Sequence, residues 1–182
     1  MNAPPPATFT VALCSMPWAI FNRPSIQLAA LTSYLEKNSS YKVDVFHPYL
    51  DIAALLGTDL YPEIAISGWA GVALFSALLF PEKFDDAKKL FLENISAASL
   101  KGVNFTSVVQ AIEKSCHHWA NNKDLSRYDL MGFSICFSQL LPSLYMARLI
   151  KDRQPALPVV FGGSSCSGEA GKSLLDHFDP VS

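Results

Sequence analysis

The chain has 182 residues, of which 50% are apolar and 16% charged, and its net charge at pH 7 is −2. This length favours one globular domain with a sizeable core, and the balanced charge gives no indication of nucleic-acid binding. The four cysteines lie far apart without C-x-x-C spacing, which is typical of reduced thiols in the cytoplasm. The first ten residues lack the pattern of a secretion signal, so we expect a cytoplasmic protein.

The N-terminal quarter predicts a strand, a helix and a second strand. Residues 9–15 are apolar and β-branched, as in a buried strand, and residues 41–47 alternate like another strand. Between them, residues 24–38 carry an apolar face with helical spacing, and Pro24 suits the first turn of that helix. Together these elements are spaced like a βαβ unit.

A helical insertion follows, over about residues 50–125. Its segments are predicted as helices over 50–56, 63–79, 82–95 and 105–120. The stretch 64–80 has no charge, but two glycines and two serines dilute it, so we expect a buried helix rather than a membrane span. No membrane partner is therefore expected.

Alternation returns in the last third of the chain. Strands are predicted over 128–137 and 157–163, and helices over 140–154 and 171–178. The final residues "DPVS" look like the start of a fifth strand, so we expect a fragment of a longer enzyme or a split product, with a free-standing domain as the alternative. The pattern predicts one α/β, Rossmann-like domain over 1–182, with a mostly parallel sheet and helices on both faces.

The segment "GKS" at 171–173 invites comparison with a phosphate-binding P-loop. That motif needs a glycine five residues before the glycine of GK, and here Cys166 occupies this position. The spacing therefore excludes a nucleoside triphosphate site of this kind.

In open parallel sheets, ligands bind outside the carboxyl ends of the strands. Three predicted strand ends carry unusual residues, at 15–18, 137–139 and 162–165, and none of these residues is charged. We expect a large, mostly uncharged ligand there rather than a bare phosphate or a metal. A plain strand-to-helix turn with capping serines would give the same local pattern.

Two stretches, "CSMPWAIFNRPSIQLAALTSYLEK" and "GFSICFSQLLPSLYMARLIKDRQPALPVVFGGSSCSGEAGKSLL", resemble the N-terminal cobalamin-binding domain of cobalamin-dependent radical S-adenosylmethionine enzymes. The resemblance is nearest to the subgroup that matures ribosomally made peptides, often by C-methylation. It implies a corrinoid held at the carboxyl edge of the sheet, with its nucleotide tail entering near Gly162 and Gly163. The cofactor-binding residues that it implies are Ser15, Met16, Pro17, Trp18, Ser134, Phe137, Ser138, Gln139, Gly162, Gly163, Ser164 and Ser165.

Two departures from related patterns limit what the chain can do. In methionine-synthase-like cobalamin domains, the histidine of a D-x-H-x-x-G motif binds cobalt from below. This chain lacks the motif, so we expect no protein metal ligand and no histidine under the corrin. It also lacks C-x-x-x-C-x-x-C, so the 4Fe-4S cluster and S-adenosylmethionine are expected only on a radical barrel outside this chain. We therefore expect no catalytic residue here.

The main hypothesis is thus a module that carries methylcobalamin to a separate catalytic barrel, through which the peptide substrate is reached. The alternative is an unrelated Rossmann-like domain that binds another small ligand without cobalamin.

Overall fold

The computed structural model describes residues 9–96, 98–99 and 102–177. Its centre is one parallel sheet in the order β2-β1-β3-β4. The strands are β1 (Thr10–Cys14), β2 (Lys42–Phe46), β3 (Leu130–Ser134) and β4 (Val159–Gly162). The prediction of an α/β, Rossmann-like fold with a parallel sheet is confirmed.

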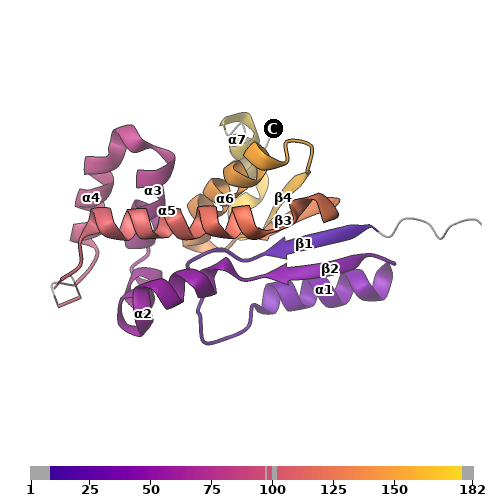
Figure 1. Cartoon of the computed structure of the whole chain (residues 1–182), viewed down its shortest axis with the longest axis horizontal. Helices are drawn as coiled ribbons and strands as arrows, with labels where there is room; N and C mark the ends of the chain where they lie inside the picture. The colour runs from indigo at the N-terminus through magenta and orange to yellow at the C-terminus, as the bar shows by residue number, and fades with distance from the viewer. Residues whose placement is uncertain (1–8, 97, 100–101, 178–182) are drawn as a thin grey trace, which may run out of the picture.

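The described part of the chain contains seven α-helices. They are α1 (Ile26–Asn38), α2 (Pro48–Ile66), α3 (Ala70–Leu79), α4 (Phe84–Glu93), α5 (Phe105–Asn122), α6 (Leu140–Arg153) and α7 (Gly168–His177). Helices α1 and α5 run along the sheet, and α3 and α4 lie beyond the arrowhead ends of β1 and β2 (Figure 1). Helix α2 has a kink at Gly57, whose φ is +79°. Helices α2 to α5 all lie between β2 and β3 in the chain, where the helical insertion was predicted.

The two faces of the sheet are covered differently. Successive side chains of a strand point to opposite faces, and on β1 the residues Val11 and Leu13 pack with Leu28 of α1 in a small cluster. Ala12 and Cys14 point to the other face and join the main core, to which α3, α5 and α6 contribute. Figure 1 shows α1 on one side of the sheet and α5 running along the other.

The apolar stretch 64–80 does not form the single buried helix that was predicted. Its helix is broken at residues 67–69, because Gly68 adopts a left-handed φ of +74° that a continuous helix cannot contain. Helices α2 and α3 consequently meet at an angle of 96°. The side chain of Ile66, which precedes the break, is 84% exposed.

Among the described residues, no single helix is long and apolar enough to cross a membrane, whereas the bent pair α2–α3 meets that test of length and composition when taken together. The predicted fifth strand at 179–182 lies outside the described residues. Helix α7 begins at Gly168, three residues earlier than the 171–178 prediction.

Candidate functional site

Loops that follow β1, β3 and β4 meet at the carboxyl edge of the sheet. The register places Cys14 opposite both Phe46 and Phe133, and Ser134 opposite Gly162, so the strands end at nearly the same level. The predicted residues 15–18, 134–139 and 162–165 therefore come from neighbouring chain segments, as the rule for parallel sheets requires.

Gln139 joins two of these loops. Its side-chain nitrogen donates to the Ser15 hydroxyl oxygen at 3.2 Å and to the Met16 carbonyl oxygen. The Cys136 backbone N–H donates to the Gln139 side-chain oxygen at 3.1 Å. Gln139 is buried, and both ends of its amide have partners within the protein, so its structural role is to hold the β1 loop against the β3 loop.

Residues 15–18, which begin the loop after β1, are buried in the core at the carboxyl edge of the sheet. Met16 and Pro17 are buried, and Trp18 is 5% exposed between Tyr61 and Phe75, with ring centroids at 5.3 and 6.1 Å. A Cβ atom at Gly71 of α3 would overlap the Trp18 indole, so this helix approaches the ring closely. Met16 and Trp18 thus form a floor, and of the four predicted residues at 15–18, Ser15 and Trp18 line the cavity described next.

A cavity of about 650 Å³ opens at the carboxyl edge, and we call it the edge cavity. It lies between the β1 loop, the start of α1, the α2–α3 bend and the β3 loop. Three exposed isoleucines stand among its lining residues, with exposed fractions of 62% for Ile20, 79% for Ile26 and 84% for Ile66. From the predicted set, it is lined by Ser15, Trp18, Ser134, Ser138 and Gln139.

A second hollow of about 240 Å³ lies on the α1 face of the sheet, and we call it the face groove. One wall is α1, through Leu31 and Leu35, and its floor includes Gly132 of β3 and Gly162 of β4. Its lining is almost wholly apolar. Ser134 lines both the face groove and the edge cavity, so the two hollows share a wall at the end of β3.

The two glycines after β4 have different surroundings. A Cβ atom at Gly162 would meet only the Phe133 carbonyl oxygen, at 3.9 Å, which leaves the space above it open to the groove. Gly163 has a φ of +114°, and a Cβ atom there would lie 2.0 Å from the Ile135 carbonyl oxygen. Gly163 is thus required by its own chain, whereas Gly162 is free to face a ligand.

Three further predicted residues, Gly163, Ser164 and Ser165, are not among the described residues that line these two hollows. Phe137 opens the short 3-10 helix Phe137–Gln139 after β3. Ser164 is exposed and Ser165 half-buried in the 3-10 helix Ser164–Cys166, and the Ser164 carbonyl oxygen accepts a hydrogen bond from the Ser167 hydroxyl at 3.2 Å.

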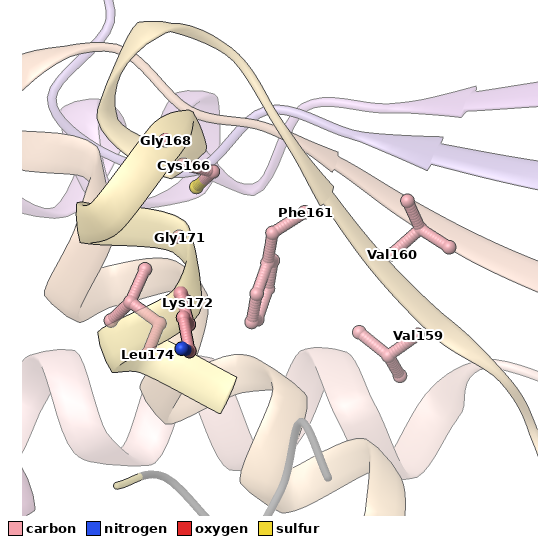
Figure 2. A pocket seen from close by; sticks show the side chains of 8 residues that line it. All are labelled: Val159, Val160, Phe161, Cys166, Gly168, Gly171, Lys172 and Leu174. Atoms are coloured by element: carbon pink, nitrogen blue, oxygen red, sulfur yellow. The ribbon is translucent and has the colours of Figure 1, made fainter. Parts of the chain in front are cut away.

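Another cavity, of about 460 Å³, separates β4 from α7. Figure 2 shows Phe161 pointing toward Leu174 and Lys172 of α7, while Val160 leaves the strand on the opposite side. Apart from Lys172 its lining carries no charged side chain among the described residues, and it includes none of the predicted ligand-binding residues.

Sequence reasoning missed several lining residues. Arg23, Ile26 and Gln27 line the edge cavity from the start of α1, and Gly132 lines the face groove from the middle of β3. The sequence did contain a signal for Gly132, because a glycine inside an apolar strand often marks the close approach of another group. Nothing in the sequence pattern around Arg23 indicated that this residue lines a cavity.

Burial changes the titration of groups near the site. The thiols of Cys14 and Cys116 are buried in the core, and burial raises both pKa values, that of Cys116 to about 12. Burial lowers the pKa of His47, which follows β2 and whose Nδ1 has no hydrogen-bond partner within the described part of the chain. His47 does not line the edge cavity.

In the described ranges, no three His, Cys, Asp or Glu side chains gather closely enough to hold a metal ion. No protein-family model, curated protein or solved structure matches this chain significantly. The hypothesis of a cobalamin module therefore rests on the resemblance of the quoted stretches and on the geometry of the edge.

Proposed function

We propose that this chain is the cobalamin-binding module of a radical S-adenosylmethionine enzyme that methylates carbon atoms of a peptide. The observation that carries the proposal is the shared wall at Ser134 between a broad edge cavity and a narrow apolar groove. Cobalamin combines a broad ring, rimmed by amides, with an aromatic nucleotide tail, and such a ligand needs both kinds of space.

The residues present fit this group. Ser15, Ser134 and Ser138 offer hydroxyls to amides, and the exposed isoleucines offer apolar surface to a ring. Gly162 leaves room for a flat tail against the sheet, whereas the Leu13 side chain lies over Gly132. Gln139 acts as a positioning residue, since it holds the two loops that bear these serines.

When bound, cobalamin supplies a cobalt–carbon bond from which a methyl group can be transferred. The chain's own residues bind and orient the corrinoid and shield one side of it. In place of a histidine, Trp18 or Trp69 would shield the lower face of the corrin. Trp18 lines the edge cavity, whereas Trp69 is 59% exposed and is not among the described residues that line it.

The remaining parts of the proposal concern partners and location. The radical barrel, with its cluster and S-adenosylmethionine, is the proposed partner, and the peptide substrate is reached through it. The four cysteines are unpaired, which suits the reducing cytoplasm as the proposed location.

Mixing the protein with hydroxocobalamin, followed by desalting and a visible spectrum, tests the proposal. We expect about one corrinoid to stay with each chain. A colourless protein fraction would favour the alternative, a Rossmann-like domain for another small ligand.

A second assay addresses activity. After reconstitution with iron and sulfide, the chain alone should form no 5′-deoxyadenosine from S-adenosylmethionine and a reductant, because it lacks the cysteine motif for the cluster. Formation of that product would refute the carrier role.

A further inference from the structure

Arg23 is the only charged side chain among the described residues that line the edge cavity. Three ion pairs occur in the described part of the chain, and they join Lys83 to Asp86, Lys89 to Glu93 and Arg127 to Asp44. Arg23 is in none of them, so its guanidinium has no carboxylate partner among the residues described. Arg23 is an exposed residue, and its guanidinium is free to pair with a negatively charged group of a ligand in the cavity.

The backbone holds Arg23 in place. The hydroxyl of Tyr49, a buried residue of α2, donates to the Arg23 carbonyl oxygen at 3.5 Å. Pro24 and the N-cap Ser25 follow directly, and the Ser25 hydroxyl accepts the Leu28 backbone N–H at 3.3 Å. Arg23 therefore leaves a fixed point at the start of α1.

The same helix end adds to the positive potential. Pro24, Ser25, Ile26 and Gln27 all line the edge cavity, so the N-terminus of α1 opens onto it. No acidic residue occupies the first turn of α1, and no carboxylate lines the cavity in the described ranges. The partial positive charge of a helix N-terminus favours an anion, and here it supplements the charge of Arg23.

The start of α1 also lies close to the wall shared with the face groove. The Gln27 side-chain nitrogen is 3.8 Å from the Cys136 sulfur, two residues beyond Ser134. A group that connects a ligand part in the edge cavity with a part in the groove would therefore pass near this helix end.

We propose that Arg23 pairs with the phosphodiester that links the corrin ring of cobalamin to its nucleotide tail. This inference rests on the proposed function. The peripheral amides of cobalamin are neutral and its phosphodiester is anionic, so a single cation beside the junction of the two hollows matches the charge of the ligand. A charge-assisted hydrogen bond from a guanidinium to a phosphate oxygen is among the strong polar contacts of proteins.

The test compares three corrinoids on the full chain by equilibrium dialysis: cobalamin, cobinamide phosphate, and cobinamide, which lacks both the phosphate and the tail. We expect Arg23→Gln to weaken the binding of cobalamin and cobinamide phosphate about tenfold and to leave the affinity for cobinamide unchanged. Arg23→Lys should retain part of the affinity. Lys37→Gln, which removes one positive charge from the last turn of α1, serves as the matched control and should change none of the three.

The possible outcomes test the phosphate pairing separately from the proposed function. If Arg23→Gln binds cobalamin as tightly as the wild-type chain, or loses affinity for all three corrinoids equally while its thermal unfolding is unchanged, the phosphate pairing is wrong and the proposed function stands. If Arg23→Gln is misfolded, Arg23→Lys decides by the same comparison. If the wild-type chain binds none of the corrinoids, both the pairing and the proposed function fall.

Discussion

The two faces of the sheet differ in how completely they are covered. On one face, α3, α5 and α6 bury large side chains such as Phe75 and Tyr145. On the other, α1 covers Val11 and Leu13 through Leu28, while Val160 of β4 is half exposed beside the face groove. The difference indicates that the packed face provides most of the stability, and that the open face leaves room for a ligand.

The largest expected difference between the two faces is the loss of unfolding free energy when a large side chain is truncated. Phe75→Ala removes a fully buried ring that contacts Trp18 and Tyr145, and it should lower the free energy of unfolding by about 3–5 kcal/mol. Leu31→Ala in the groove wall should cost less than about 1 kcal/mol, because Leu31 is 45% exposed. Urea denaturation measures both, and equal losses would contradict the assignment of stability to the packed face.

The two glycines after β4 offer a comparison of adjacent residues. Gly163→Ala should cost about 3 kcal/mol, because its left-handed φ and the overlap with the Ile135 carbonyl oxygen both oppose a side chain. Gly162→Ala should cost less than about 1 kcal/mol, since its Cβ has open space. If Gly162→Ala is less stable than Gly163→Ala in chemical denaturation, Gly162 does not lie on an open groove floor.

Gln139→Leu should lower the free energy of unfolding by about 2 kcal/mol. The substitution leaves the Met16 carbonyl oxygen and the Cys136 backbone N–H without the partner that Gln139 gives them in a buried place. Ser143→Ala, which removes a hydroxyl donating to the Gln139 backbone oxygen at 2.7 Å, is a milder control. If Gln139→Leu is as stable as the wild type, the amide does not hold the loops together.

Alkaline pH should weaken the packed face. The buried Cys116 thiol has a pKa raised by burial from 9.0 to about 12, so in the unfolded chain it loses its proton first. Its contribution to stability is therefore complete below pH 9 and is lost as pH rises toward 12, by about 1 kcal/mol at pH 10. Denaturation midpoints of Cys116→Ala should fall less steeply with pH than those of the wild type between pH 9 and 10, and parallel curves would count against this burial.

The lower face of bound cobalamin gives a spectroscopic prediction. Because His47 does not line the edge cavity, the cob(II)alamin form should show no superhyperfine splitting from a protein imidazole nitrogen in electron paramagnetic resonance. Such a splitting, lost in His47→Gln, would contradict the arrangement proposed for the edge cavity.

Local sequence patterns predicted the sheet well but predicted the residues that line the two hollows only in part. The predicted strand 9–15 contains Thr10–Cys14, because a run of apolar, β-branched residues has few alternatives inside a domain. The predicted helix 64–80 was wrong at Gly68, since a glycine within an apolar run does not reveal its φ angle. Arg23 and Gly132 were missed because both hollows are built from segments that are distant in sequence.

The most direct test of the central claim fills the face groove without disturbing the core. Gly162→Val places a branched side chain on the groove floor, where a Cβ atom has open space. Equilibrium dialysis against cobalamin should show at least about a tenfold loss of affinity, with an unchanged melting temperature. Leu92→Ala, a change at an exposed position on α4, should bind like the wild type. Undiminished affinity of Gly162→Val would contradict the claim that the open face of the sheet receives the nucleotide tail.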